Sequence, residues 1–298
     1  MKVLLATDGS ESAARAANVV RNVAWPASSA VRIVSVVRPV VDASLGIPGV
    51  VTSSETMDRL LEAAVTEARR VVGLLATGLR AHGLTVEESV VEGRPASVIV
   101  ELAGEFHPDL IVVGSHGRGR VASMVLGSVS TEVVESAPCS VLVVRSDAIG
   151  RLILADDSSP SAAVASQLVE HMPGFRGLPV RVVSVEDRTP AWYGWLGAES
   201  ADEIQAFEDA MAADREARAT TAARDVTALK AAGLVADSTV RQGDPGHEIV
   251  AAAKDFNADL IVMGTRGQTG LTRLLLGSVA RKVLQQAHCS VLVVRRGG

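Results

Sequence analysis

The chain is poor in cysteine and in aromatic residues. Its 298 residues include two cysteines, Cys139 and Cys289, and no CxxC pair. This usage fits a reducing compartment, so we expect a cytoplasmic protein. Aromatic residues make up 3% of the chain and apolar residues 48%. The core must therefore be built mainly from valine, leucine, isoleucine and alanine.

Long charged runs and long apolar runs are also absent. The formal net charge is −5, and no basic run is long enough to follow a nucleic-acid backbone, so we expect no nucleic-acid partner. No apolar stretch approaches the length of a membrane span. Asp8 interrupts the apolar N-terminal run too early for a signal peptide. We therefore expect no membrane partner.

Several catalytic signatures are missing. The chain has no GK dipeptide, and hence no Walker A lysine, and it contains neither HExxH nor GxSxG. Its six histidines show no metal-ligand spacing, and no Cys/His nucleophile pair stands out. We therefore assign no catalytic residue and no metal ion held by protein side chains.

A repeated stretch is the strongest positive signal. Residues 109–128 read DLIVVGSHGRGRVASMVLGS and residues 259–278 read DLIVMGTRGQTGLTRLLLGS. Each copy carries three glycines and a serine at the same spacing, which we call the glycine frame: Gly114, Gly117, Gly127 and Ser128 in the first copy, and Gly264, Gly267, Gly277 and Ser278 in the second. Two complete frames at a constant offset indicate a duplicated site.

The glycine frame predicts a phosphate-binding site. A strand that runs into a Gly-rich turn brings backbone N–H groups up to phosphate oxygens, and glycine has no Cβ to hold the ligand away. A helix is expected over residues 129–136, and the free N–H groups of a first helical turn favour anions. Further candidate ligands are therefore Val129, Ser130 and Val279. Glycines that only form a turn are the alternative.

Strands and helices alternate in both halves. We expect strands at residues 3–7, 31–37, 85–91, 110–113 and 140–144, and again at 152–155, 180–185, 239–242, 260–263 and 290–294. Long helices are expected at residues 11–23, 54–81, 96–105, 199–232 and 246–254. Ser10 and Ser159 are expected to cap the first helix of each half. This order predicts an α/β fold with two open parallel-sheet, Rossmann-like domains in tandem, at residues 1–147 and 148–298.

One helix carries an apolar stripe that predicts its buried face. In residues 54–81 the stripe has helical periodicity. It consists of Leu60, Leu61, Ala64, Ala68, Val71, Val72 and Leu75.

The DLIVVG strand, the glycine frame and the closing CSVLVV strand together resemble the nucleotide-binding branch of the universal stress protein family. The chain looks like a tandem member. The resemblance implies one adenine-nucleotide site per domain, for ATP or another adenine nucleotide, with Mg²⁺ bound through the phosphates. It also implies that Asp8 and Asp157 accept a ribose hydroxyl and that the backbones of Val36 and Val185 pair with the adenine edge.

The same resemblance implies that the two domains associate as an intramolecular pseudo-dimer through their last strands. Such pairing would keep Cys139 and Cys289 apart as unbridged thiols. A homodimer and an unidentified protein partner are left open.

Other interpretations of individual residues also stay open. Asp8 and Asp157 are the expected ribose ligands, but either could be a helix-capping residue, and Asp156 is an additional acid beside the second of them. Three residues inside the frames either touch phosphates or are solvated loop residues: His116, Arg118 and Arg266. An aromatic cluster in the second half is either a hydrophobic cover or partner surface, or a lid over the second adenine: Trp192, Tyr193 and Trp195.

Three functions fit these observations. The favoured one is an ATP-binding module of a stress response or signalling pathway. A slow Mg²⁺-dependent ATP hydrolase is the second, and a scaffold that does not bind nucleotide is the third. No lysine lies in either frame, and no acidic residue lies within residues 114–130 or 264–280 to hold Mg²⁺ or orient water. We therefore expect a binding module rather than a fast enzyme.

Overall fold

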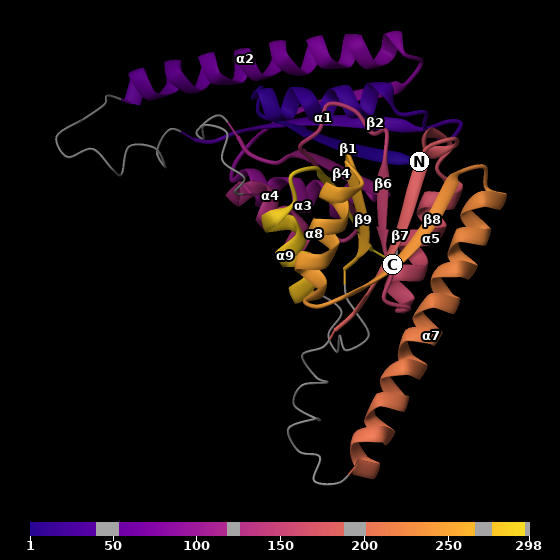
Figure 1. The fold of residues 1–298 in the computed structure, drawn as a ribbon. Helices are drawn as coiled ribbons and strands as arrows, with labels where there is room; N and C mark the ends of the chain where they lie inside the picture. The colour runs from indigo at the N-terminus through magenta and orange to yellow at the C-terminus, as the bar shows by residue number, and fades with distance from the viewer. Residues whose placement is uncertain (40–53, 118–125, 188–200, 266–275, 296–298) are drawn as a thin grey trace. The chain divides into compact units, whose positions relative to one another are not determined.

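The computed structural model of the chain describes residues 1–39, 54–117, 126–187, 201–265 and 276–295. They form two compact units: unit 1 spans Met1–Asp147, and unit 2 begins at Ala148 (Figure 1). Each unit has a parallel sheet with connecting helices, which confirms the predicted fold class of two α/β domains in tandem.

Unit 1 is built on strands in the order β3-β2-β1-β4-β5. The strands are β1 (Lys2–Thr7), β2 (Ala30–Val37), β3 (Thr85–Glu92), β4 (Leu110–Gly114) and β5 (Ser140–Val144). The described helices are α1 (Glu11–Asn22), α2 (Ser54–Ala81), α3 (Pro95–Phe106) and α4 (Ser128–Ser136). Val3 lies opposite Val31 on one side and Leu110 on the other, both in parallel pairing. The strand order therefore reverses between β1 and β4, the usual place for a ligand in such sheets.

Unit 2 repeats this plan in the order β8-β7-β6-β9-β10. Its strands are β6 (Leu152–Ala155), β7 (Pro179–Glu186), β8 (Val235–Gln242), β9 (Leu260–Gly264) and β10 (Ser290–Val294). Its described helices are α5 (Pro160–His171), the short 3-10 turn η3 (Pro173–Phe175), α7 (Ala201–Ala231), α8 (Pro245–Asp255) and α9 (Ser278–Gln286). The sequence did not predict η3.

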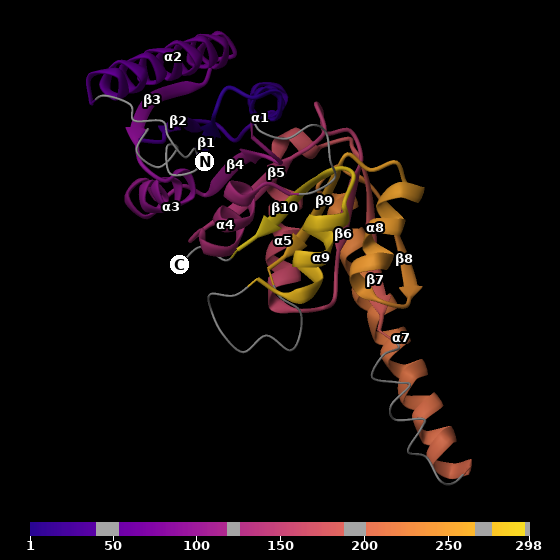
Figure 2. The same cartoon turned by 90° about the vertical axis from the view of Figure 1, so that its left-hand side faces the viewer.

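Helices cover both faces of each sheet. In unit 1, α1 packs beside α2 and α3 packs beside α4 (Figure 2). In unit 2, α5 packs beside α7 and α8 packs beside α9 (Figure 1). A strand covered on both faces needs apolar side chains at every position. The central strands meet this need with fully buried residues: Leu4, Leu5, Ile33, Ile111, Leu152, Ile153, Leu154, Leu260 and Ile261.

Both predicted N-caps are confirmed. Ser10 Oγ accepts a hydrogen bond from the Ala13 N–H at 3.2 Å at the start of α1. Ser159 Oγ accepts one from the Ala162 N–H at 3.2 Å at the start of α5. Pro160 occupies the first helical position, where its missing N–H would have had no partner inside the helix.

The predicted buried face of α2 is wrong in its first half. Leu60 is 51% exposed and Ala64 is exposed, whereas the buried stripe begins at Ala68 and continues through Val72 and Leu79. A helix of 28 residues is roughly 42 Å long, whereas the eight-residue strands beneath it span roughly 26 Å. The helix is longer than the surface that could cover it, so its first turns remain exposed.

The strand predicted at residues 239–242 starts earlier than expected. It is β8, which begins at Val235 and includes Asp237. Asp237 accepts two hydrogen bonds from Arg181 on β7, at 2.8 and 2.7 Å, and these bonds hold the pKa of Asp237 below its usual value. Aspartate has a low propensity for strands, so the sequence does not predict a strand at Asp237. The cross-strand ion pair with Arg181 stabilises it there.

Candidate functional site

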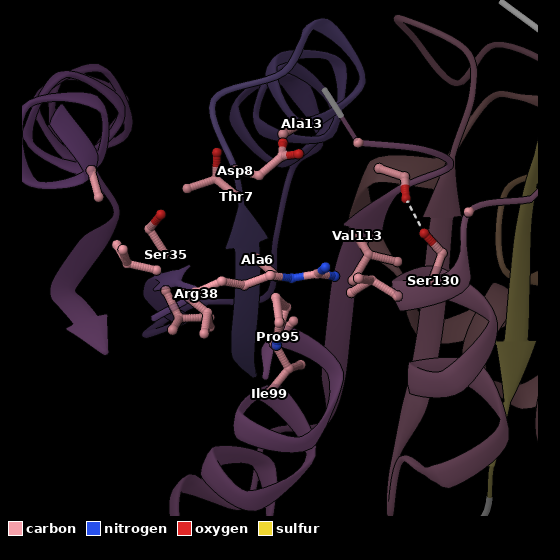
Figure 3. Close-up of a pocket in the computed structure, with 18 of the residues that line it drawn as sticks. Ala6, Thr7, Asp8, Ala13, Ser35, Arg38, Pro95, Ile99, Val113 and Ser130 are labelled. Carbon is pink, nitrogen blue, oxygen red and sulfur yellow. Dashed lines mark hydrogen bonds between the residues drawn. The ribbon is translucent and has the colours of Figure 1, made fainter. Parts of the chain in front are cut away.

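Unit 1 contains a cavity of about 710 Å³ at the carboxyl ends of β1, β2 and β4 (Figure 3). It lies where the strand order reverses, which is where open α/β sheets bind ligands. The structure brings together here all the predicted first-half site residues that it describes: Asp8, Val36, Gly114, Gly117, Gly127, Ser128, Val129 and Ser130. Arg118 lies outside the described residues.

One end of the cavity is formed by the first glycine frame and the start of α4. The Gly127 N–H donates to the Ser115 carbonyl at 2.7 Å, which closes the turn. The first bond inside the helix runs from the Thr131 N–H to the Gly127 carbonyl at 2.9 Å. The N–H groups of residues 128–130 therefore have no carbonyl partner within α4 and are available to a ligand. The positive end of the helix dipole favours an anion there.

Ser130 ties this helix start to the preceding strand. Its Oγ donates to the Gly114 carbonyl at 2.7 Å, as drawn in Figure 3. Ser130 is 4% exposed, so this bond is shielded from water. In unit 2 the same position is Ala280, which is also buried but cannot form the bond.

The frame glycines serve two different purposes. A Cβ on Gly114 would lie 2.8 Å from the Ser12 carbonyl carbon and 2.9 Å from its oxygen, because α1 crosses β4 closely there. Gly114 is therefore needed for packing. A Cβ on Gly117 would instead lie 2.8 Å from Asp8 Oδ2, at the pocket itself. The backbone dihedral φ of these glycines is not in the left-handed region, so lack of space, not backbone strain, requires glycine.

Asp8 shapes the turn before α1 and also lines the cavity, whereas the N-cap of the helix is Ser10. Asp8 Oδ1 accepts the Ser10 N–H at 2.9 Å, which shapes the turn before α1. Its carboxylate is exposed and also lines the cavity, where Figure 3 shows it beside Thr7 at the end of β1. One carboxylate oxygen thus forms the turn while the other faces Gly117.

Val36 lies just beyond the pairing of two strands. The last pair between β1 and β2 joins Thr7 and Ser35. Val36 is the next residue of β2, and it lines the cavity. On the β1 side Val36 has no paired residue in the register, whereas on the other side it pairs with Val91 of β3.

Three polar residues at the first glycine frame form a hydrogen-bond network: Ser12, Ser115 and His116. Of these, only His116 was a candidate from the sequence. Ser115 Oγ lies 3.0 Å from His116 Nδ1 and 3.4 Å from Ser12 Oγ. The Ser12 hydroxyl in turn accepts the His116 N–H at 3.4 Å. Only the tertiary structure brings the helix residue Ser12 to the frame. A sequence signal existed for Ser115, because Thr265 keeps a hydroxyl at the same place in the second copy.

Unit 2 repeats the frame geometry where it is described. The Gly277 N–H donates to the Thr265 carbonyl at 2.9 Å, and the Arg281 N–H donates to the Gly277 carbonyl at 3.0 Å. Ser278 and Val279 therefore begin α9 as Ser128 and Val129 begin α4. Gly264 packs against Ser161 as Gly114 packs against Ser12. Gly267 and Arg266 lie outside the described residues, as does the aromatic cluster Trp192, Tyr193 and Trp195.

The structure separates the roles of the two acids after β6. Asp157 Oδ1 accepts the Ser159 N–H at 3.0 Å, so Asp157 corresponds to Asp8. Asp156 Oδ1 accepts the Ser158 N–H at 2.9 Å, so Asp156 takes the place of Thr7, whose hydroxyl accepts the Gly9 N–H. Val185, the counterpart of Val36, is 7% exposed near the end of β7.

Asp156 is a buried acid in an unfavourable environment. It is 5% exposed, and its Oδ2 has no hydrogen-bond partner among the described residues. Burial raises the pKa of Asp156, and the nearby Asp225 and Asp157 raise it further, whereas the Ser158 N–H and Arg224 act in the opposite direction. Burial also raises the pKa of Asp225. Unit 1 has no such pair, because threonine replaces Asp156 there.

The described residues contain no group of three or more acidic, histidine or cysteine side chains that could hold a metal ion. Among the described helices, none is long and apolar enough to cross a membrane. Both cysteines are buried thiols.

Comparison with known proteins decides the family. The universal stress protein family matches the chain twice, over residues 1–145 and 149–295. The chain belongs to the universal stress protein family. A universal stress protein of Mycobacterium tuberculosis is 31% identical over 221 residues, covering 72% of this chain and 70% of that protein. One of Mycolicibacterium smegmatis is 27% identical over 300 residues, covering 96% and 95%.

A solved structure supports the same fold. The crystal structure of a universal stress protein from Archaeoglobus fulgidus matches with a TM-score of 0.62 and 19% identity, and covers 99% of this chain and 98% of that one. The family therefore accounts for both halves of this universal stress protein, in agreement with the resemblance inferred from its sequence.

Proposed function

We propose that this universal stress protein binds an adenine nucleotide in the unit 1 cavity and acts as a stress-response or signalling module. The observation that carries the proposal is the convergence of the candidate residues. Segments that follow β1, β2 and β4, together with the start of α4, line one cavity. The residues proposed for phosphate, ribose and base thus line one cavity and do not lie at separate places on the sheet edge.

The size of the cavity suits such a ligand. Small-molecule sites usually have volumes of roughly 300–1,000 Å³, and this one has about 710 Å³. Its walls combine apolar side chains with a few polar groups at its ends, which is the usual composition of a site that orients a ligand. Val34, Val113 and Ile99 contribute apolar surface beside the proposed base position.

Each part of the nucleotide has a proposed partner. The phosphates would lie on the N–H groups of residues 128–130 and beside Gly117. A ribose hydroxyl would donate to Asp8, whose carboxylate lines the cavity. The base would pair with the backbone of Val36. Mg²⁺, where present, would be held by the phosphates and water.

Unit 2 is proposed as a second nucleotide site with the same plan. The support is the matching turn and helix start at Gly277 and Ser278, together with Asp157 and Val185 at the places of Asp8 and Val36. The two buried cysteines fit a cytoplasmic location, which we propose on that basis.

The proposal is tested by identifying what the protein carries. Freshly purified protein is denatured, and the released small molecules are analysed by mass spectrometry. We expect an adenine nucleotide, and we expect saturable binding of ATP, ADP or AMP by the protein after the ligand has been removed. Absence of both a carried nucleotide and saturable binding would favour the scaffold function.

A further inference from the structure

Arg38 contributes a positively charged side chain to the lining of the unit 1 cavity, and it comes from the end of β2, outside the glycine frame. It follows the last residue of β2, Val37, and it lines the cavity. Figure 3 shows its side chain crossing the cavity toward Val113. Val113 directly precedes Gly114, the first glycine of the frame. In this view the guanidinium group therefore points toward the strand that leads into the glycine frame.

The first glycine frame contains no lysine, and its two arginines, Arg118 and Arg120, lie outside the described residues. Among the described residues that line the cavity, Arg38 is the only lysine or arginine. The lining acids are Asp8 and Glu67, and Glu67 is bound by Arg70 at 2.8 Å. A guanidinium group offers paired N–H donors that match phosphate oxygens, and it does not lose its charge in proteins.

Unit 2 has the opposite charge at this place. The strand pairing shows which residues of the two units correspond. Val3 pairs with Val31 in unit 1, and Leu152 pairs with Val180 at the same place in unit 2. Counting along β2 and β7 from these pairs, the counterpart of Arg38 is Asp187.

A second acid lies beside Asp187. Val37 corresponds to Glu186, which is 2% exposed and accepts hydrogen bonds from Arg215 at 3.0 Å and from Gln242 at 2.9 Å. The end of β7 therefore has Asp187 in place of an arginine and Glu186 in place of a valine, and the Glu186 charge is paired with Arg215.

We propose that Arg38 is a specificity-determining residue that binds the phosphate groups of the ligand in unit 1. Unit 2, with Asp187 in its place, binds the metal-free anion more weakly and needs a divalent cation on the phosphates to reach similar affinity. This inference rests on the proposed nucleotide function. It adds that the duplicated sites differ in the ionic form of the nucleotide that they accept.

The test compares Arg38→Gln with a matched control, Arg32→Gln, which changes an arginine within β2, the strand that Arg38 follows. Arg32 binds Glu87 at 2.8 and 2.6 Å and does not line the cavity. Ligand-free protein is titrated with ATP and with adenosine in a buffer containing EDTA. We expect one tight ATP equivalent per chain in the wild type. Arg38→Gln should weaken it roughly 10- to 100-fold, the loss typical of a hydrogen bond to a charged group. Adenosine affinity should change by less than about twofold, and Arg32→Gln should behave as the wild type.

Several results would overturn the proposal. These are unchanged ATP affinity in Arg38→Gln, equal losses of ATP and adenosine affinity, an equal loss in Arg32→Gln, or two equally tight ATP equivalents in EDTA. If the wild type binds neither ATP nor adenosine, the nucleotide function itself is wrong. Tripolyphosphate, which has no base or ribose, then tests Arg38 alone. Weaker binding in Arg38→Gln supports the anion role, and no binding or no difference rejects it.

Discussion

Gly117 and Asp8 lie side by side in the lining of the unit 1 cavity, so closely that a Cβ on Gly117 would lie 2.8 Å from Asp8 Oδ2. Gly117→Ala should displace the Asp8 carboxylate, which we propose as the ribose ligand. It should also reduce the space for phosphate groups beside residue 117. We expect nucleotide affinity to fall by about tenfold or more, equivalent to about 1.4 kcal/mol. Stability should change little, because the displaced group is an exposed side chain. Calorimetric titration and thermal melting measure the two effects.

Gly78→Ala is a matched control for this change. Gly78 lies in α2, and a Cβ there would meet nothing within 4 Å. Alanine at such a position should stabilise the helix by about 0.5–1 kcal/mol and leave binding unchanged. Equal nucleotide affinity in Gly117→Ala and Gly78→Ala would count against the proposed site. The corresponding change in unit 2, Gly267→Ala, is predicted to weaken binding in that unit.

Gly114→Ala should act on stability first. The new Cβ would approach the backbone of Ser12, which cannot move without shifting α1. Overpacking of this kind costs about 1–3 kcal/mol. Gly264→Ala should have a similar effect in unit 2, through Ser161. Denaturant unfolding of ligand-free protein measures the loss. Unchanged midpoints in both variants would show that the helix and strand are less tightly packed than described.

Asp156→Asn should stabilise unit 2 at neutral pH. Burial raises the pKa of Asp156, so the folded state keeps this proton to a higher pH than the unfolded chain does. Such an acid lowers stability as the pH rises above its unfolded pKa of about 3.9 and through its folded pKa. Asparagine keeps an oxygen for the Ser158 N–H without the charge. We expect a gain of about 1 kcal/mol at pH 7 that shrinks toward pH 4.

Unfolding measured between pH 4 and pH 8 tests this prediction. Asp58→Asn serves as the control, because Asp58 is exposed on α2. It should change stability by less than about 0.5 kcal/mol. A gain in Asp156→Asn that is the same at pH 4 and pH 7 would show that desolvation of the charged form is not its cause.

Substitution of Arg215 should lower the stability of unit 2 more than substitution of its ion-pair partner Glu186. Arg215 is about half exposed, with 49% of its side-chain surface accessible, whereas the Glu186 side chain is 3% exposed. Arg215→Ala leaves a buried carboxylate without its cation, a strongly unfavourable change, whereas Glu186→Val leaves an arginine that water can solvate. The melting temperature should fall more in Arg215→Ala than in Glu186→Val. The double variant should recover part of the loss, and failure to recover would indicate that Arg215 stabilises unit 2 by packing instead.

ATP turnover should be slow, well below the roughly 10 s⁻¹ of a median enzyme. Phosphoryl transfer needs positioned cations and a group that orients water. Residues 114–130 and 264–280 contain no acidic residue for the latter role. Steady-state assays with Mg²⁺ and Mn²⁺ measure turnover. Several turnovers per second that disappear in Gly117→Ala would make this protein an enzyme.

Much of the fold was predictable because local chemistry and repetition agree. Continuous apolar runs predicted the buried strands. Ser10 and Ser159 predicted the helix starts, because an N-cap needs only a side-chain oxygen that accepts the N–H of the residue three positions later. The repeat at residues 109–128 and 259–278 showed the tandem arrangement. Errors arose where distant partners decide the outcome. Leu60 is exposed because α2 is longer than the strands it covers, and β8 starts early because Arg181 pairs with Asp237.

The sequence by itself determined the glycine spacing, the family resemblance and the list of candidate ligands in each half. The tertiary structure decided which of them meet in one cavity, because strand ends that are far apart in the chain become neighbours in a parallel sheet. It also shows why glycine is needed at two positions. A Cβ on Gly114 would collide with Ser12 of α1, and a Cβ on Gly117 would collide with the Asp8 carboxylate. Arg38 joined the candidate residues only through the sheet, because the parallel pairing of β1 with β2 and β4 places the end of β2 at the same cavity as the glycine frame.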